Sequence, residues 1–143
     1  NKPRAMPLSI VHGDFNPANF LYKDGQVSAL IDWEASRVGD PREDLGWMVL
    51  MDVYSNTHVM DYPKKEGGFL AYYNKLTGND ITPQELGYFM LFGTMEIAIP
   101  VQQFVARRVH KEFTLLLPLY VAQTSMAVLP AMAQAMGYMG VSA

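Results

Sequence analysis

The Asp24-Gly25 dipeptide strongly limits how the first part of this chain folds, because it separates two runs with strand character. The runs cover residues 19–23 (NFLYK) and 26–31 (QVSALI), and Asp-Gly favours a tight two-residue turn between antiparallel strands. Residues 7–11 (PLSIV) have the composition of a further short strand. The sequence therefore predicts a small β-hairpin that follows one strand and a loop.

The expected hairpin register brings two oxygen-bearing side chains together. A two-residue turn pairs Lys23 with Gln26, and the same register places Asn19 opposite Leu30. Because side chains alternate between the faces of a strand, Asp32 then points to the same face as Asn19, about 7 to 8 Å away. An amide oxygen and a carboxylate are hard ligands that suit Mg²⁺ shared with water and phosphates. A slip of one residue in the register would point the two side chains to opposite faces.

Asp14 precedes Asn19 by five residues and is expected on the loop between the first strand and the hairpin. Phosphoryl transfer uses one carboxylate to orient the attacking hydroxyl and others to hold metal on the nucleotide phosphates. The transition state is loose, so the first carboxylate need not be a strong base. The simplest structural alternative is that Asp14, Asn19 and Asp32 are turn and capping residues beside glycine and proline.

The pattern becomes helical from about residue 40. Asp40 is in the position of an N-cap, Pro41 is at the first helical position, and Glu43 is where a capping-box acid belongs. The following residues 45–54 (LGWMVLMDVY) are apolar on nearly every side, as in a helix buried by its neighbours.

Two further helices are expected after this one. The first covers residues 64–76 and ends at Gly78. Residues 82–85 (TPQE) repeat the capping pattern and begin a long apolar helix, which Pro100 is expected to kink or break. The predicted fold class is therefore α+β and mostly helical.

Length and composition indicate one folded domain. The 143 residues are half hydrophobic, and they divide into a part with the loop and hairpin (1–40) and a helical part (41–143). The formal charge of -3 argues against nucleic-acid binding through a basic surface. The absence of cysteine excludes disulfides, thiol nucleophiles and Cys-rich zinc sites.

Residues 113–143 contain no charged side chain, which raises the question of a membrane span. A spanning helix needs about 20 apolar residues. Pro118, Pro130 and several interspersed polar residues favour two short buried helices instead. The methionines of this segment suggest an adaptable packing surface, in the core or against a second copy of the chain. The N-terminus has no apolar run typical of a signal peptide, so a cytoplasmic location is expected.

Three segments, in order, resemble one known family. HGDFNPAN (12–19) resembles the H-x-D-x-x-x-x-N catalytic loop of the aminoglycoside phosphotransferase and choline kinase-like enzymes, which are relatives of the protein kinases. IDWE (31–34) resembles their metal-binding segment, and GDPREDLGW (39–47) is similar to the G-D-P-x-x-D-L run that follows. The resemblance covers residues 8–50 well. It implies the C-terminal lobe of a protein-kinase-like fold, with a small hairpin at the catalytic loop.

The resemblance also implies roles for individual residues. It makes Asp14 the catalytic base, and Asn19 and Asp32 the Mg²⁺ ligands. His12 would brace the catalytic loop, and Asp44 would hydrogen-bond to the loop backbone from the next helix. The implied reaction transfers a phosphoryl group from Mg-ATP to a hydroxyl of a small molecule.

Trp33 and Glu34 lie next to the metal-binding segment and are candidates for substrate contact, although packing or a surface role is an equal alternative. Their Trp-Glu form is closer to the kinase-like domains found beside acyl-CoA dehydrogenases than to the antibiotic-resistance enzymes. Residues 60–143 contain few acids, so a less cationic substrate than an aminoglycoside is expected.

An intact member of the family has an N-terminal lobe with a glycine-rich nucleotide loop, a phosphate-binding lysine and its glutamate partner. Only 11 residues precede His12, and none of these parts is among them. The chain is therefore expected to be a C-terminal lobe that works with an N-terminal lobe of the same protein. Little or no kinase activity is expected of these residues alone.

Two other functions remain open. One is a pseudokinase or small-molecule binding module, although the presence of Asp14, Asn19 and Asp32 together speaks against it. The other is a metal-dependent phosphohydrolase that uses His12, Asp14 and Asp32. Such enzymes usually gather more histidine and carboxylate ligands around two metals.

Overall fold

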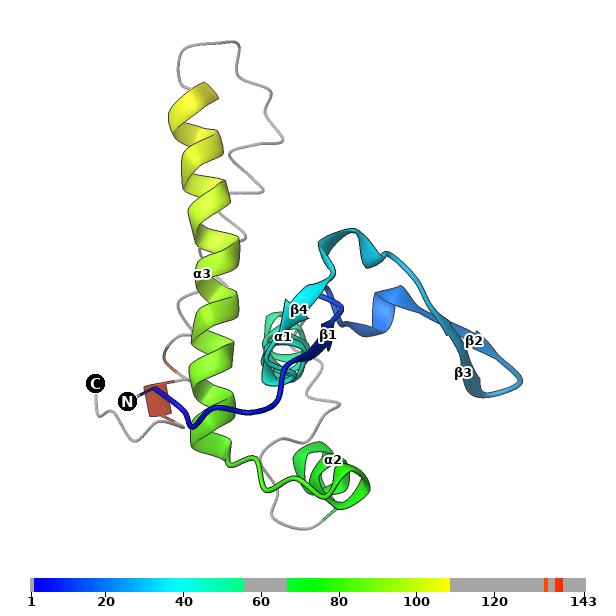
Figure 1. The fold of residues 1–143 in the computed structure, drawn as a ribbon. Coiled ribbons are helices and arrows are strands. Elements are labelled where there is room, and N and C mark those ends of the chain that lie inside the picture. Colours follow the sequence, from blue (N-terminus) through cyan, green and yellow to red (C-terminus); the bar gives the residue numbers. More distant parts are fainter. Residues whose placement is uncertain (1, 56–66, 109–132, 134–135, 138–143) are drawn as a thin grey trace.

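The computed structural model describes residues 2–55, 67–108, 133 and 136–137 of the 143. All its strands lie in the first 39 residues and its α-helices begin at residue 42, which confirms the predicted α+β class (Figure 1). In chain order the elements are β1 (Ser9–Val11), the 3₁₀ helix η1 (Pro17–Asn19), β2 (Phe20–Lys23), β3 (Gln26–Leu30), the 3₁₀ helix η2 (Trp33–Ala35), β4 (Arg37–Gly39), α1 (Arg42–Tyr54), α2 (Phe69–Thr77) and α3 (Pro83–Arg108).

The strands form two separate antiparallel pairs, β1 with β4 and β2 with β3. The second pair is the predicted hairpin. Asp24 and Gly25 have φ angles of 51° and 77°, which is the positive pair that a two-residue type I′ turn requires. In Figure 1 the hairpin projects away from the helices, while β4, paired with β1, leads into the start of α1.

The predicted register of the hairpin is wrong beyond its first two pairs. Tyr22 pairs with Val27 as expected, but Leu21 pairs with Ala29, so Ser28 is an extra residue in a bulge. The Ser28 hydroxyl donates a hydrogen bond to the Leu21 carbonyl at 3.1 Å, which occupies a backbone group at the irregular step.

As a result, Asn19 lies opposite Ile31, whose N–H donates to the Asn19 carbonyl at 3.0 Å, and the expected pairing of Asn19 with Leu30 is wrong. Strand β3 also ends at Leu30, before Asp32. Strand alternation therefore does not place Asn19 and Asp32 on one face.

The hydrogen bonds of both predicted capping boxes are present, although α1 begins at Arg42, one residue later than the sequence predicted. The Asp40 carboxylate accepts from the Arg42 N–H at 3.0 Å, and Glu43 accepts from the Asp40 N–H at 3.0 Å. At the start of α3, Thr82 Oγ accepts from the Glu85 N–H at 3.2 Å, and Glu85 accepts from the Thr82 N–H at 2.8 Å. Each box satisfies two backbone donors that a helix start would leave unpaired.

The other helix boundaries agree with the sequence in part. Helix α2 ends at Gly78, which is left-handed with φ of 71°, as predicted. Its start is Phe69, after a glycine pair, and the expected first turn at 64–66 lies outside the described residues. Helix α3 continues through Pro100 to Arg108, so a break there is wrong. The two helices expected within 113–143 fall almost entirely outside the described residues.

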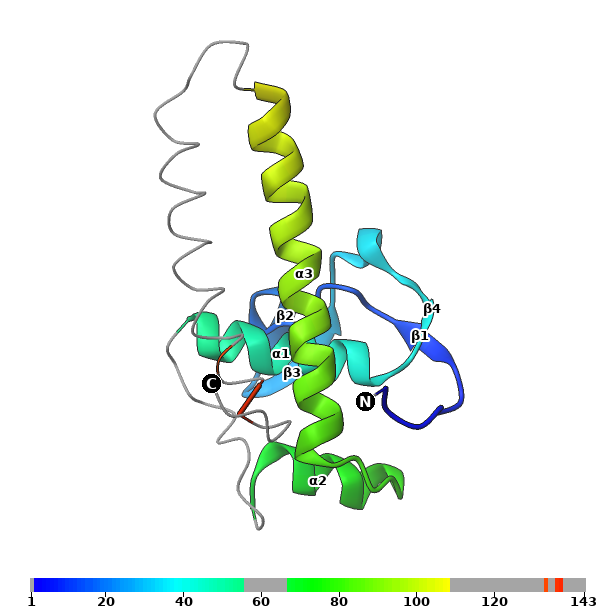
Figure 2. The ribbon, with the colours of Figure 1, turned by 90° about the vertical axis from the view of Figure 1, so that its left-hand side faces the viewer.

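The core lies where α1 crosses α3. Figure 1 views α1 end-on beside the upright α3, and Figure 2 shows the same crossing from the side. Gly46 permits the close approach, because a Cβ on it would lie 2.7 Å from the backbone of Phe89. The buried side chains of this core are Leu45, Val49, Leu70, Ile81, Leu86 and Met90. Among the helices of the described part, none is long and apolar enough to cross a membrane.

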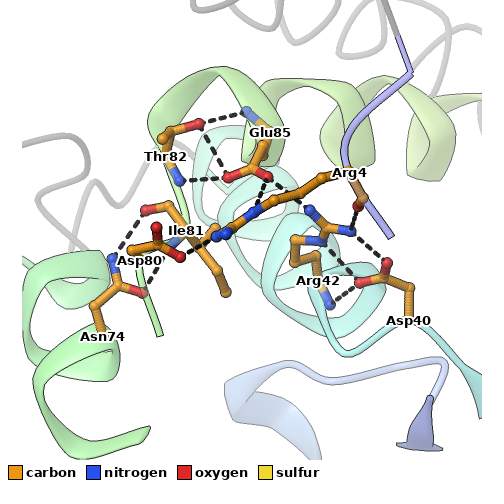
Figure 3. Close-up of polar contacts among 8 residues, drawn as sticks. All are labelled: Arg4, Asp40, Arg42, Asn74, Asp80, Ile81, Thr82 and Glu85. Carbon is orange, nitrogen blue, oxygen red and sulfur yellow. Dashed lines mark hydrogen bonds and ion pairs between the residues drawn. The ribbon is translucent and has the colours of Figure 1, made fainter. Parts of the chain in front are cut away.

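Arg42 joins three segments that are distant in sequence (Figure 3). Its guanidinium is 1% exposed and donates to both carboxylate oxygens of Asp40, at 2.9 and 2.6 Å. It also donates to Glu85 at 2.9 Å and to the Arg4 carbonyl at 2.6 Å, and it stacks on Phe89 at 4.9 Å. This buried cation therefore holds the N-terminal segment and the starts of α1 and α3 together.

Candidate functional site

The loop between β1 and β2 begins with a glycine that no other residue can replace without strain. Gly13 has φ of 85°, and a Cβ on it would contact the Ala35 carbonyl oxygen and lie 2.9 Å from the Ala35 Cβ. The loop and the segment after Asp32 are therefore packed against each other at this point.

We expect Gly13→Ala to lower the free energy of unfolding by more than about 2 kcal/mol, since the left-handed backbone alone costs a non-glycine residue about 1–2 kcal/mol. Gly25→Ala is the matched control, because Gly25 has φ of 77° and a Cβ on it would meet nothing within 4 Å. Gly25→Ala should lower the free energy of unfolding only by the cost of the left-handed backbone. Urea denaturation measures both values, and equal losses would show that the contact with Ala35 is unimportant.

Asp44 holds the start of the loop from α1. Its two carboxylate oxygens accept from the backbone N–H groups of His12 at 2.8 Å and Gly13 at 2.9 Å. This is the contact that the family resemblance implied for Asp44. It connects the loop rigidly to the helix, because a charged acceptor forms stronger hydrogen bonds than a neutral one.

His12 lies beneath the loop, where it is 1% exposed. Its Nδ1 accepts from the Asp14 N–H at 3.2 Å, so Nε2 carries the proton and donates to the Ile31 carbonyl at 2.9 Å. The ring also packs on Trp33, with 4.5 Å between the ring centroids. Both ring nitrogens are therefore engaged by the backbone, an arrangement that suits a bracing role better than proton transfer.

The Asp14 carboxylate is held by three N–H donors. Oδ1 accepts from Asn16 Nδ2 and from Trp47 Nε1, each at 2.8 Å, and Oδ2 accepts from Asn19 Nδ2 at 2.8 Å. The side chain is partly buried. Oδ1 thus has two donors and Oδ2 has one, which leaves Oδ2 with more capacity to accept a hydrogen bond from a ligand.

Asn19 is the second sequence-predicted residue that the structure brings to Asp14. It is 9% exposed, and its Nδ2 donates to the backbone carbonyl of Asp14 at 2.9 Å as well as to the carboxylate. A carboxylate and a carbonyl only accept, so the amide nitrogen must face them. The Asn19 side-chain oxygen accepts no hydrogen bond among the described residues and is available as a metal ligand.

Asp32 has an unusual backbone for a residue with a side chain. Its φ of 67° is left-handed, and it begins η2 without a capping hydrogen bond from its side chain. Strain of this kind persists where the surrounding structure imposes it, and it is often found at functional positions. The carboxylate is exposed and has no hydrogen bond within the described part of the chain, so it can receive a ligand.

The two candidates for substrate contact follow Asp32 in η2. Trp33 is 46% exposed, and its Nε1 donates to the Leu30 carbonyl at 2.9 Å while its ring covers His12. Glu34 is exposed. Trp33 therefore has a structural contact on one side and an open face on the other.

Arg37 anchors the segment that follows η2. It donates to Glu43 at 2.7 Å and to Glu96 at 3.0 Å, which connects β4 to both α1 and α3. Burial raises the pKa of Glu96 above its usual value, although the charge of Arg37 opposes this shift.

Sequence reasoning missed two residues of this site, Asn16 and Trp47. Asn16 is within the catalytic-loop motif, where a side-chain amide two residues from Asp14 is well placed for a local hydrogen bond. Trp47 lies three residues after Asp44, so the two share a helix face. That spacing could have indicated that both side chains reach the same loop.

The two candidate ligands, Asn19 and Asp32, suit a hydrated, nucleotide-bound Mg²⁺ better than a metal enclosed by protein. The described residues contain no group of three or more His, Cys, Asp or Glu side chains that could hold a metal. Mg²⁺ commonly takes one or two protein ligands and completes its shell with water and substrate phosphates. The Asn19 oxygen and the Asp32 carboxylate are of the right chemistry for that arrangement.

Comparison with known proteins gives the same family. A region of mouse Acyl-CoA dehydrogenase family member 10 is 38% identical over 50 residues, which is 34% of this chain and 5% of that protein. Uncharacterized protein YcbJ of Bacillus subtilis (strain 168) is 29% identical over 62 residues, 42% of this chain and 20% of that protein. The chain thus spans only a small part of these relatives. The model of the phosphotransferase enzyme family (APH) matches residues 1–80, more than half of the chain, and the chain therefore belongs to this family.

Proposed function

We propose that this chain provides the catalytic part of an ATP-dependent phosphotransferase, which moves the γ-phosphoryl group of Mg-ATP to a hydroxyl of a small molecule. Membership of the phosphotransferase family supports the reaction class and a kinase-like fold. The observation that carries the proposal is the Asp14 carboxylate, which three N–H donors orient while Oδ2 keeps room for a further hydrogen bond.

In the proposed reaction, Asp14 Oδ2 accepts a hydrogen bond from the acceptor hydroxyl and orients its oxygen toward the γ-phosphorus. As the bond between this oxygen and the γ-phosphorus forms, the bond from the γ-phosphorus to the bridging oxygen of ADP breaks, and ADP leaves. The hydroxyl proton passes late to Asp14 Oδ2. Catalysis of this kind depends on positioning more than on a strong base.

The Asn19 side-chain oxygen and the Asp32 carboxylate would hold Mg²⁺, which supplies charge neutralisation to the nucleotide phosphates when it is bound. Asn19 also donates to Asp14 through its nitrogen. One side chain would therefore connect the hydroxyl-orienting carboxylate with the metal ligands.

We expect Asp32→Asn in the full-length protein to raise the Mg²⁺ concentration for half-maximal activity at least about tenfold, because even supporting groups of metal sites contribute 10–100-fold to affinity. Asp24→Asn is the matched control. It removes the same charge at the turn of the preceding hairpin, an exposed position where asparagine is equally favoured. A Mg²⁺ titration of the rate compares the variants, and equal curves would exclude Asp32 as a ligand.

The nucleotide is proposed to bind with the help of an N-terminal lobe of the full-length protein. No glycine-rich loop of the G-x-G-x-x-G type is present in the 143 residues. We therefore propose little or no activity for these residues alone. Purified residues 1–143 that phosphorylated an acceptor at ordinary rates would contradict this.

The acceptor is proposed to be a hydroxylated metabolite with little positive charge, and Trp33 and Glu34 are candidates to contact it. The test is a screen of the full-length protein with radiolabelled Mg-ATP and hydroxylated metabolites, scored for phosphorylated product. Phosphate release without any acceptor would favour a phosphohydrolase instead. Nucleotide binding without turnover for any acceptor would favour a pseudokinase or binding module.

A further inference from the structure

Trp47 contributes a hydrogen bond to the candidate base that the sequence motifs do not assign. It lies on α1 one turn after Asp44, and both side chains reach the loop that contains Asp14. Asp44 binds the loop backbone, whereas the indole N–H of Trp47 donates to Asp14 Oδ1 at 2.8 Å.

The origin of the three donors to Asp14 distinguishes Trp47 from the other two. Asn16 and Asn19 belong to the same loop as Asp14. Trp47 is the donor that comes from another element within the described residues. It therefore holds the carboxylate directly from α1, whereas the loop donors are connected to α1 only through the loop backbone that Asp44 binds.

The indole is itself held in place by α3. A Cβ on Gly93 would lie 3.2 Å from Trp47 Cε3 and 3.2 Å from Leu50 Cδ2, so the ring packs directly on the helix backbone at that glycine. The indole is partly buried. Its position is thus determined by the crossing of α1 and α3, which is the packed centre of the described fold.

The chemistry of the indole suits an anchor. Its N–H is a donor only, so it cannot take the proton of an incoming hydroxyl. It donates to Oδ1, so that Oδ2 keeps room to accept a hydrogen bond from a ligand. A carboxylate held on one oxygen from a rigid helix cannot rotate freely, and misplacement of a reacting group by about 1 Å can cost 10²-fold in rate.

We propose that Trp47 is a positioning residue, which fixes the orientation of the Asp14 carboxylate so that Oδ2 receives the acceptor hydroxyl. This inference rests on the proposed phosphotransfer function. It adds an anchor from α1 to the loop residues that the motifs identify.

The first test uses Trp47→Phe in the full-length protein with an acceptor from the screen. Phenylalanine keeps an aromatic ring against Gly93 but has no N–H. We expect kcat to fall about 10- to 100-fold with KM for ATP within about twofold. Met51→Leu, one turn further along α1, is the matched control and should leave both constants unchanged. An unchanged kcat for Trp47→Phe would overturn the inference.

A double-mutant cycle separates positioning from packing. If Trp47 acts through Asp14, then Trp47→Phe should cause no further loss in the residual rate of Asp14→Ala. If Trp47→Phe lowered the rate by the same factor in the wild-type protein and in Asp14→Ala, the indole would act only through packing. If Asp14→Ala itself left the rate unchanged, a different group would orient the hydroxyl, and the proposed role of Asp14 would fail together with the positioning role. If Asp14→Ala lowered the rate and Trp47→Phe did not, only the positioning role would fail.

An NMR measurement tests the contact without any activity. The sequence has two tryptophans, so the indole N–H region contains one signal from Trp47 and one from Trp33, which donates to the Leu30 carbonyl. Asp14→Ala should shift the Trp47 signal and leave the Trp33 signal in place. A Trp47 signal that does not move would show that the hydrogen bond is absent, even if Trp47→Phe proved unstable.

Discussion

Replacing Asp14 with alanine or asparagine is expected to lower kcat of the full-length protein about 10²- to 10⁴-fold, which is the range for removal of a positioned acid–base group. Both substitutions remove the carboxylate oxygen that has room for the acceptor hydroxyl. Asparagine keeps the size of the side chain, so its loss would reflect chemistry more than packing.

Binding of Mg-ATP should be largely kept in these variants, because Asp14 contacts loop and helix donors and is not one of the proposed metal ligands. Steady-state rates and calorimetric titration with Mg-ATP separate the two effects. A normal rate in either variant would mean that a different group orients the hydroxyl. If the affinity for Mg-ATP fell by the same factor as the rate, Asp14 would act in nucleotide binding instead.

Replacing Arg42 with methionine is expected to lower the free energy of unfolding by about 3–5 kcal/mol, the usual loss when one partner of a buried ion pair is removed. The substitution removes the guanidinium from Asp40 and Glu85 and leaves both carboxylates poorly paired. It also removes the donor to the Arg4 carbonyl.

Arg4→Met is the matched control for this loss. Arg4 pairs with Asp80 and, at 3.1 Å, with Glu85, but its side chain is 51% exposed, so water screens these pairs. Its loss should be clearly smaller than that of Arg42→Met. Urea denaturation of both variants gives the comparison, and similar losses would show that Arg42 is no more important than a surface charge.

Acidification should weaken the same network. Burial alone would raise the pKa of Asp40, but hydrogen bonds from the Arg42 side chain and backbone bring it below its usual value. Burial alone would also raise the pKa of Glu85, but hydrogen bonds from Thr82 and Arg4 bring it below its usual value. A lowered folded-state pKa gives stability that is present above the unfolded pKa near 4 and is lost as the pH falls through the folded value. The wild-type protein should therefore lose stability below about pH 4, and Arg42→Met should show a flatter curve.

Several elements could be predicted because their signals lie within a few residues of the structure they determine. The Asp24-Gly25 turn, the capping boxes at Asp40 and Thr82, and the left-handed end of α2 at Gly78 are all local. Each depends on the φ angles that a residue tolerates, or on a side chain that reaches a backbone group within three positions. The segments of the candidate site were likewise found from their order and spacing.

The hairpin register could not be predicted in the same way. Ser28 can lie in a regular strand or in a bulge, and the choice depends on how β2 and β3 continue into the loop beside Asp14. Pairing of β1 with β4 joins residues 9–11 to residues 37–39, and no short-range signal specifies it. Helix α3 continues past Pro100, because a proline removes only one hydrogen bond from a helix that is otherwise paired.

By itself the sequence determined the family, the order of the first strand, the hairpin and the α-helices, and the residue types of the candidate site. Only the tertiary structure decided which side chains meet. The approach of Trp47 to Asp14 and the burial of Arg42 both follow from the crossing of α1 and α3. Contacts of this kind join residues tens of positions apart, and they form because apolar helix faces pack closely. Turn and capping signals extend over about four residues and cannot specify them.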